Sequence, residues 1–226
     1  MRVWARATDA AQAQPVGIWR FDEGVGTAAG DSSDHGHDAT VTGGATWVAG
    51  HNDWDIGSLG FNGTDTEASA TSVLNTDQSF SVTAWANLSS TAKSATVVGQ
   101  DGPRTSAFQL GFDKDCGCWA FGMPAADADG ATRVIAAAPA AAATGTWTHL
   151  AGVYDAVNDS ATLYVNGDPV TTVAVPATQW KSTGPLTIGR GRTNGAAANW
   201  FAGGIDDVRV YQGIETDTAI SEDYLS

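Results

Sequence analysis

Hydrophobic and polar residues alternate along two neighbouring stretches of the chain, 147–155 and 160–166. Every second side chain in such a stretch points to the same face, so the pattern predicts β-strands and not an amphipathic helix. The dipeptide Asn166-Gly167 closes the second stretch. It favours a tight hairpin turn, because both central residues of that turn need positive φ. The sequence therefore predicts that the chain folds back on itself here.

Similar stretches recur along the chain, interrupted by the Gly, Pro, Asn and Asp residues that favour turns. Residues 79–88 are the clearest case, because Phe80, Val82 and Leu88 fall on one face and mainly polar residues fall on the other. One dry face of this kind indicates a sheet packed on one side. A short helical turn is expected within 216–225. The predicted strands cover 17–22, 38–48, 57–61, 66–71, 79–88, 95–100, 106–112, 118–123, 132–138, 146–155, 160–166, 169–175, 184–189 and 200–212.

Four motifs carry a family resemblance. They are the opening segment 19–24, the loop 31–36, the segment 147–167 and the closing segment 204–211, and they occur in this order. Together they resemble the laminin G-like, concanavalin A-like jelly-roll domains of secreted proteins. The resemblance implies an all-β fold, a two-sheet antiparallel β-sandwich, that is used mostly for binding and often holds calcium. It does not identify the ligand.

The resemblance covers about residues 16–226, which we expect to form one jelly-roll domain. Residues 1–15 differ, since Val3, Ala5 and Ala7 alternate like the last strand of an immunoglobulin-like or fibronectin-like module. We therefore expect this segment to be the tail of a preceding β module or a linker. It also lacks the apolar core of a signal peptide. We expect a longer, multidomain and extracellular chain, with the domain itself monomeric.

The resemblance also implies a calcium site near the two ends of the domain, because the first and last strands of this fold commonly lie side by side. Carried over by position, Glu23, Asp31 and Asp206 would bind calcium through their side chains, and His35 through its backbone carbonyl. Calcium takes roughly six to eight oxygen ligands, and a tight polar loop supplies several of them. A chelator should then lower the melting temperature.

An alternative interpretation of the same acidic residues needs no ion. Asp31 could cap a turn through hydrogen bonds from its side chain to the backbone. Asp206 or Asp207 could pair with an arginine on a neighbouring strand. The sequence leaves both interpretations open.

Tryptophan residues in predicted loops are a second group of candidates. An exposed Trp ring can form a platform for the apolar face of a sugar when polar neighbours bind the hydroxyl groups. Trp54 lies between Asp53 and Asp55, and Trp180 and Trp200 lie in or next to loops. Half-exposed loop tryptophans also commonly close the end of a sandwich, so a packing role stays open for all three.

Residue patterns of catalysis are missing from the sequence. No Gly-x-Ser-x-Gly nucleophile motif occurs, and no Glu-x-Asp-x-Glu strand provides the carboxylate pair of the jelly-roll glucanases. His149 falls within a predicted strand, which favours packing over proton transfer. The other histidines lack the spacing of a zinc site. We therefore expect a protein that is not an enzyme.

Charge and cysteine content restrict the partners further. The formal net charge is −14, and no basic cluster offsets it, which disfavours nucleic acid. No apolar run approaches the ~20 residues that span a bilayer. Cys116 and Cys118 could form a small disulfide in a hairpin or remain free.

These observations favour a non-catalytic extracellular module, with structural calcium, that binds a glycan or a cell-surface protein. A structural spacer or adhesion module without a ligand of its own is one alternative. A divergent polysaccharide hydrolase or lyase is the other, because enzymes also occur on this sandwich.

Overall fold

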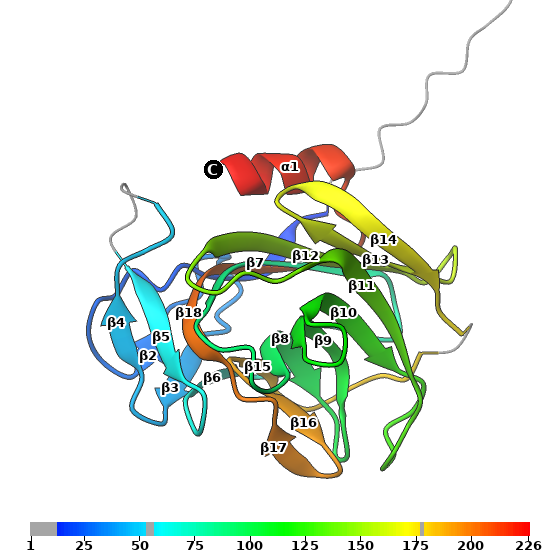
Figure 1. The fold of residues 1–226 in the computed structure, drawn as a ribbon, viewed down its shortest axis with the longest axis horizontal. Coiled ribbons are helices and arrows are strands. Elements are labelled where there is room, and N and C mark those ends of the chain that lie inside the picture. The colour runs from blue at the N-terminus through cyan, green and yellow to red at the C-terminus, as the bar shows by residue number, and fades with distance from the viewer. Residues whose placement is uncertain (1–12, 53–56, 177–178) are drawn as a thin grey trace, which may run out of the picture.

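Two antiparallel sheets stack face to face in the computed structural model, which describes residues 13–52, 57–176 and 179–226 (Figure 1). Sheet A has the strand order β14-β13-β12-β7-β18-β5-β4, and β1 also pairs with β18. This architecture confirms the predicted two-sheet β-sandwich. The strands of sheet A are β1 (Pro15–Trp19), β4 (Thr46–Val48), β5 (Ser58–Asn62), β7 (Phe80–Leu88), β12 (Trp147–Asp155), β13 (Ser160–Val165), β14 (Asp168–Ala174) and β18 (Ala202–Gln212).

Sheet B has the order β11-β10-β9-β8-β15-β6-β3-β2. A separate hairpin of β16 (Gly191–Thr193) and β17 (Ala196–Ala198) lies beyond it, on the side of the molecule away from the helix α1 (Asp217–Leu225) (Figure 1). The strands of sheet B are β2 (Ala28–Ala29), β3 (Ala39–Thr42), β6 (Glu67–Ala70), β8 (Ala95–Asp101), β9 (Ser106–Asp113), β10 (Cys118–Pro124), β11 (Arg133–Ala141) and β15 (Leu186–Ile188).

The core lies between the two sheets. Phe80 of β7 packs against Phe108 of β9, with 4.8 Å between the ring centroids. Val82 and Leu88 of β7 are fully buried in the same core. The inward positions of β7 are those that the alternation predicted, which follows from the period of two along a strand.

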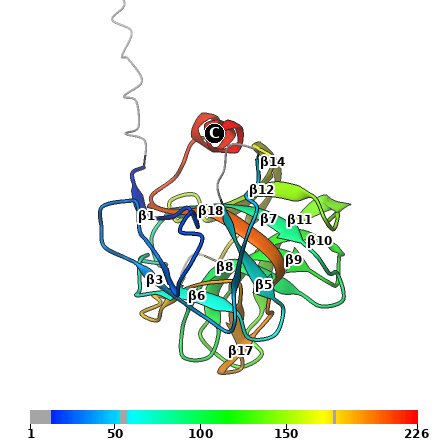
Figure 2. The ribbon, with the colours of Figure 1, turned by 90° about the vertical axis from the view of Figure 1, so that its left-hand side faces the viewer.

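The hairpin predicted between β13 and β14 is present. Asn166 and Gly167 have φ values of 52° and 84°, as the tight turn requires. The first and last strands also lie side by side, since Ile18 pairs with Arg209 and Trp19 with Val208 (Figure 2). The two ends of the domain therefore meet in sheet A.

The strand prediction differs from the structure in two ways. The single strand predicted over 38–48 is two strands, β3 in sheet B and β4 in sheet A. Gly43 and Gly44, both with positive φ, separate them and let the chain cross from one sheet to the other. The short strands β2, β16 and β17 were not predicted, because two or three residues carry no readable period.

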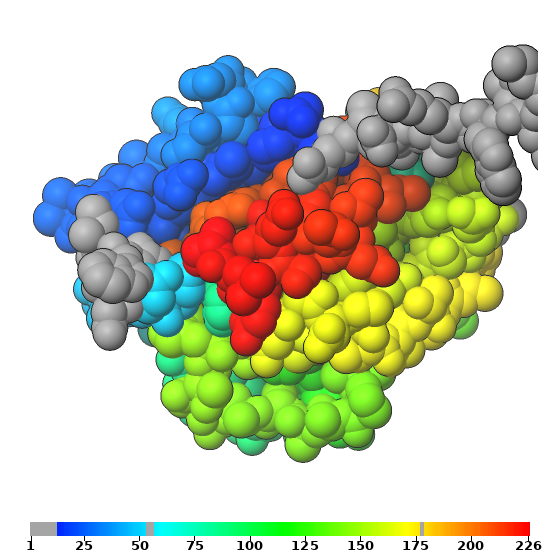
Figure 3. Space-filling view, turned by 90° about the horizontal axis from the view of Figure 1, so that it is seen from above, coloured from blue at the N-terminus to red at the C-terminus, as the bar shows by residue number. Residues whose placement is uncertain are grey.

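The helix α1 is longer than the predicted single turn. Thr216 caps it by accepting a hydrogen bond from the backbone N–H of Ala219. Ile220 packs against Ala151 and Tyr164 on the outer face of sheet A, and this packing supports a helix that is too short to be stable alone. In Figure 3 the helix lies on the surface between the N-terminal segment and β13–β14. No helix of the described part of the chain is long and apolar enough to cross a membrane.

Candidate functional site

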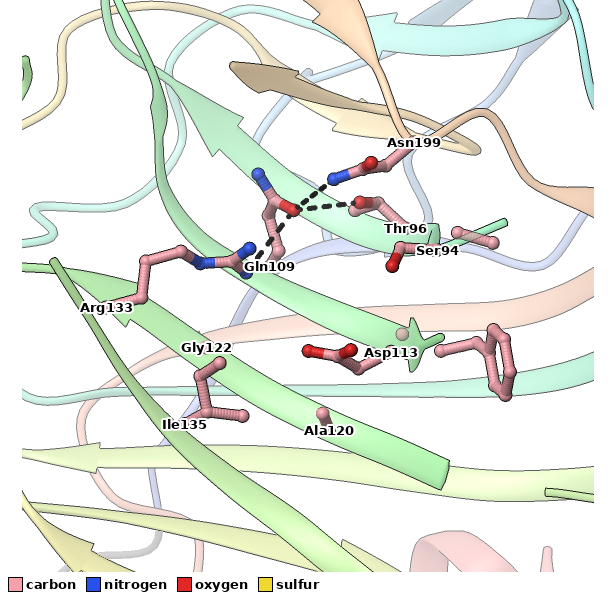
Figure 4. Close-up of a pocket in the computed structure, with 12 residues that line it drawn as sticks. Ser94, Thr96, Gln109, Asp113, Ala120, Gly122, Arg133, Ile135 and Asn199 are labelled. Atoms are coloured by element: carbon pink, nitrogen blue, oxygen red, sulfur yellow. Dashed lines mark hydrogen bonds between the residues drawn. The ribbon is translucent and has the colours of Figure 1, made fainter. Parts of the chain in front are cut away.

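A groove runs over the outer face of sheet B, across strands β8 to β11 (Figure 4). Its floor is low because the outward-facing residues there are small. Gly111 of β9 lies opposite Ala120 of β10, and Gly122 lies opposite Gln109. The residues between them point the other way, into the core, as alternation along a strand requires. Small outward residues thus lower the floor of the groove, and the guanidinium of Arg133 covers this floor at Gly122.

Gln109 is the centre of a hydrogen-bond network at one side of the groove. Its Oε1 atom accepts hydrogen bonds from Asn199 Nδ2 at 3.0 Å and from Thr96 Oγ1 at 3.3 Å, with Arg133 Nη2 at 3.5 Å (Figure 4). Its Nε2 atom donates to the carbonyl of Arg192 at 3.3 Å. Because Gln109 is only 7% exposed, it holds its neighbours in place. Asn199 and Arg133 are the more exposed members of the network.

Asn199 reaches the groove from the segment that follows β17. Its backbone has a φ of 53°, and its carbonyl accepts a hydrogen bond from the N–H of Thr96 at 2.8 Å. Asparagine tolerates this left-handed conformation better than most residues do. The backbone of Asn199 is therefore bound to β8, and its side chain is bound to Gln109 of β9.

A buried ion pair supports the groove from one side. Asp101 at the end of β8 is 1% exposed and binds the guanidinium groups of Arg190 and Arg192. Ser106 also donates a hydrogen bond to Asp101 at 2.9 Å. Because the carbonyl of Arg192 accepts from Gln109, this pair helps to fix the network of the groove.

Asp113 and Ser94 lie at the opposite end of the groove (Figure 4). Asp113 is the only carboxylate among the described residues that line it. Here the turn between β9 and β10 contains a disulfide between Cys116 and Cys118. Cys118 pairs with Asp113 in the β-ladder, so the disulfide closes the turn beside the groove.

The structure places Asp31 in a turn that is bound by backbone N–H groups. Its Oδ1 atom accepts from Ile18 and Ser33, and its Oδ2 atom accepts from His37, each at 2.9 Å. Burial raises the pKa of Asp31, but these hydrogen bonds outweigh burial and lower it below its usual value. These side-chain to backbone hydrogen bonds are the contacts expected when Asp31 caps a turn.

The other predicted calcium ligands are also engaged by donors. Glu23 accepts from the N–H of Gly30 at 2.7 Å. Asp206 is fully buried, and its Oδ2 atom lies 3.0 Å from both the backbone N and the ring Nδ1 of His51. His35, whose backbone carbonyl is the predicted ligand, is exposed, and its ring lies 3.0 Å from the carbonyl of Ser33.

These contacts do not fit a calcium ion held jointly by Asp31 and Asp206. N–H groups point their positive ends at the carboxylate oxygens that the ion would need. In the described ranges, no group of three or more His, Cys, Asp or Glu side chains is arranged to hold a metal. Calcium therefore stays a prediction of the sequence that a titration tests.

The predicted tryptophans differ in where they lie. Trp54, Asp53 and Asp55 are outside the described residues. Trp180 is half-buried and donates a hydrogen bond to the carbonyl of Pro124 at 3.3 Å, which is a packing role. Trp200 is half-buried and lines a hollow next to the groove.

A cluster of aromatic rings occupies the outer face of sheet A, beside α1. His51 stacks on Trp85 with 4.5 Å between centroids, and Tyr224 of α1 lies 5.6 Å from Trp85. His149 lies in the same cluster and is 2% exposed. Burial, reinforced by the positive charge of Arg209, lowers the pKa of His149 to about 4. A histidine that stays neutral and buried fits the predicted packing role.

The groove was not predicted from the sequence, although a signal was present. In the predicted strands 106–112 and 118–123, large apolar residues alternate with Gln109, Gly111, Ala120 and Gly122. Two neighbouring strands with small outward residues indicate a depression in the sheet. Arg133 reaches this depression through the register of β11 on β10, and Asn199 reaches it through its hydrogen bonds to Thr96 and Gln109.

The profile of the family described as "Concanavalin A-like lectin/glucanases superfamily" matches residues 61–221. The chain belongs to this superfamily. The match confirms the family resemblance, and it includes the motif segments 147–167 and 204–211, the four groove strands β8 to β11 and Asn199. A comparison with curated proteins finds no match.

Solved structures share the fold at low sequence identity. Domain 4 of AbnA, an extracellular GH43 arabinanase from Geobacillus stearothermophilus, in complex with arabinotriose, has a TM-score of 0.71 and 18% identity, covering 93% of this chain and 98% of that one. The receptor-binding domain of botulinum neurotoxin type G has a TM-score of 0.69 and 13% identity, covering 94% of this chain and 51% of that one. Trypanosoma rangeli sialidase in complex with the inhibitor DANA has a TM-score of 0.67 and 17% identity, covering 100% of this chain and 35% of that one.

Proposed function

We propose that this domain is a non-catalytic carbohydrate-binding module and that the groove on sheet B binds the glycan. The observation that carries the proposal is the network centred on Gln109, which holds polar side chains over a floor of Gly111, Ala120 and Gly122. Such a site combines donors and acceptors in fixed positions with space for a ligand against the sheet.

Sugar hydroxyls suit this arrangement because each can both donate and accept a hydrogen bond. Asn199 has donors and an acceptor, and the hydroxyl of Ser94 offers both as well. The small floor lets the C–H face of a ring lie close to the strands, where apolar atoms are removed from water. A ligand bound to rigid strands also loses less affinity to the ordering of the protein.

The lining of the groove favours binding over hydrolysis. A glycoside hydrolase of the usual kind needs two carboxyl groups across the scissile bond. Among the described lining residues Asp113 is the one carboxylate. We therefore assign no catalytic residue.

The comparisons support a binding role outside the cell. The arabinanase domain was solved with an oligosaccharide and matches this chain along nearly the whole length of both. The neurotoxin neighbour is named as a receptor-binding domain, so a cell-surface protein is the second class of partner. We propose that the domain is extracellular and acts within a longer chain. The proposal requires no calcium ion.

A glycan array followed by calorimetry tests the proposal. Two variants alter the groove in different ways: Asn199→Gly removes a polar side chain but keeps the positive φ, and Ala120→Leu fills the floor. Thr162→Ala on sheet A serves as the control. We expect specific array hits whose Kd rises at least tenfold in both groove variants, with melting near wild type, and does not change in the control.

Three outcomes would contradict the proposal. A blank array would favour the structural spacer, since a spacer has no ligand of its own. Binding that both groove variants leave intact would place the site elsewhere on the domain. New reducing ends or unsaturated products from a polysaccharide panel would instead support the hydrolase or lyase alternative.

A further inference from the structure

Arg133 differs from the other arginines near the groove. Arg104, Arg190 and Arg192 each form an ion pair with an aspartate. Within the described residues Arg133 forms none, and its hydrogen bond to Gln109 is long at 3.5 Å. Its guanidinium group therefore has most of its five N–H donors available to a ligand.

A glycine lets this guanidinium lie close to the sheet. A Cβ atom on Gly122 would lie 2.7 Å from Arg133 Nη2 and 3.4 Å from its Cζ atom. The guanidinium therefore lies against the strand β10 at the floor of the groove (Figure 4). Any residue other than glycine at 122 would push it away.

The charge of the molecule makes this arrangement notable. With a net charge of −14, the protein repels anions in general. The positive charge of Arg133 can therefore attract an anion only at short range, inside the groove. Asp113 attracts Arg133 through space, and the described residues show no hydrogen bond between the two side chains. Because Arg133 has no ion-pair contact within the described residues, a carboxylate of the ligand can supply one.

We propose that the groove selects glycans that carry a carboxylate and that Arg133 binds the carboxylate. The inference rests on the proposed function of the groove. A planar guanidinium matches a carboxylate with two parallel hydrogen bonds, which gives both strength and orientation. Asn199 and Ser94 then bind the hydroxyls of the same or the adjoining sugar. The ligand is an acidic sugar with isolated carboxylates, because the general negative field disfavours a densely charged polyanion.

Matched pairs of ligands test the inference by calorimetry. The probes are trigalacturonate with its carboxyl-reduced form, and sialyllactose with lactose, so that uronic and sialic acids are tested separately. We expect the wild type to bind at least one acid ten or more times more tightly than its neutral partner. Added salt should weaken binding of the acid and leave binding of the neutral sugar unchanged.

Three variants separate the charge of Arg133 from its geometry. Arg133→Gln should reduce the affinity for the acid to that of its neutral partner, so that the ratio of the two affinities falls to about one. Arg133→Lys keeps the charge but loses the paired hydrogen bonds, so it should restore part of the preference. Gly122→Ala keeps the arginine but displaces it, and we expect a loss close to that of Arg133→Gln.

The possible failures are distinguishable. Equal affinity for acid and neutral partner, or an acid preference that survives in Arg133→Gln, overturns the inference and leaves the glycan-binding groove in place. Equally tight binding of sulfated and carboxylated forms of one sugar also overturns it, because the proposed selection is for a planar carboxylate. Absence of binding to every acidic and neutral glycan defeats the proposed function itself.

Discussion

Asn199 Nδ2 donates a hydrogen bond to Gln109 Oε1, and the two atoms are 3.0 Å apart although the residues are 90 positions apart in the sequence. This bond joins the segment after β17 to the centre of sheet B. The groove is therefore built by long-range packing, and its polar groups converge only in the folded chain.

Asp31 is expected to stabilise the domain through its three backbone hydrogen bonds. Asp31→Ala leaves the N–H groups of Ile18, Ser33 and His37 without their acceptor. We expect the free energy of unfolding at pH 7 to fall by about 2 to 4 kcal/mol, since a charged acceptor and several partly buried donors are involved. Urea unfolding measures this change.

The pH dependence of the same variant has a definite sign. The pKa of Asp31 is lowered in the folded state, so its contribution is present above the ordinary value of 3.8 and is lost as pH falls through the folded pKa. The difference between wild type and Asp31→Ala should shrink below about pH 4. Asp34→Asn in the same loop is the control, expected to change stability by less than ~0.5 kcal/mol. A constant difference down to pH 2 would contradict this role.

His149 should make the domain less stable in mild acid. Its pKa of about 4 in the folded state lies below the ordinary 6.5, so the unfolded chain takes up the proton first. The stability is full above pH 6.5 and falls as pH drops towards 4, by about 2 kcal/mol at pH 5 and about 3 kcal/mol in all. Arg209 and His51 oppose protonation, and Asp207 favours it.

The variant His149→Phe isolates this effect, because it keeps a ring in the aromatic cluster and removes the titrating group. Between pH 7.5 and pH 5, the free energy of unfolding measured with denaturant should fall by about 2 kcal/mol less in His149→Phe than in wild type. His35→Phe, at an exposed position, should follow the wild-type curve. Identical pH profiles for wild type and His149→Phe would show that His149 is already exposed to protons in the folded state.

Calcium is tested by melting the protein with EDTA and with millimolar calcium. Because N–H donors already bind the carboxylates of Asp31 and Asp206, we expect the two melting temperatures to agree within about 1 °C. An increase of several degrees with calcium, lost in Asp206→Asn, would reinstate the ion that the family resemblance implies and would require the loop 31–36 to rearrange.

Much of the fold could be predicted because a strand in a sandwich has one dry face. The alternation of Phe80, Val82 and Leu88 can be read from neighbouring residues in the sequence. The same is true of the turn-forming dipeptide Asn166-Gly167. The crossing between β3 and β4 could not be predicted in the same way. Both strands have the same local pattern, and only the packing decides which sheet each one joins.

The site could be predicted less well, for a physical reason. Acidic residues such as Asp31 attract attention in a sequence, yet a carboxylate can bind backbone N–H groups as readily as it binds a cation. Polar residues such as Gln109 and Asn199 give no such signal, because their role in a site depends on whether the fold brings them to the same face. The pairing of Gly122 with Gln109 across β10 and β9 makes the groove, and register is not visible in one strand alone.

The most direct test of the account compares the affinity of wild type, Asn199→Gly and Ala120→Leu for the strongest hit of a glycan array. If the groove on sheet B binds the glycan, calorimetry will show Kd values at least tenfold higher in both variants, at wild-type melting temperature and with Thr162→Ala unchanged. Unchanged Kd values in both folded groove variants would contradict the account.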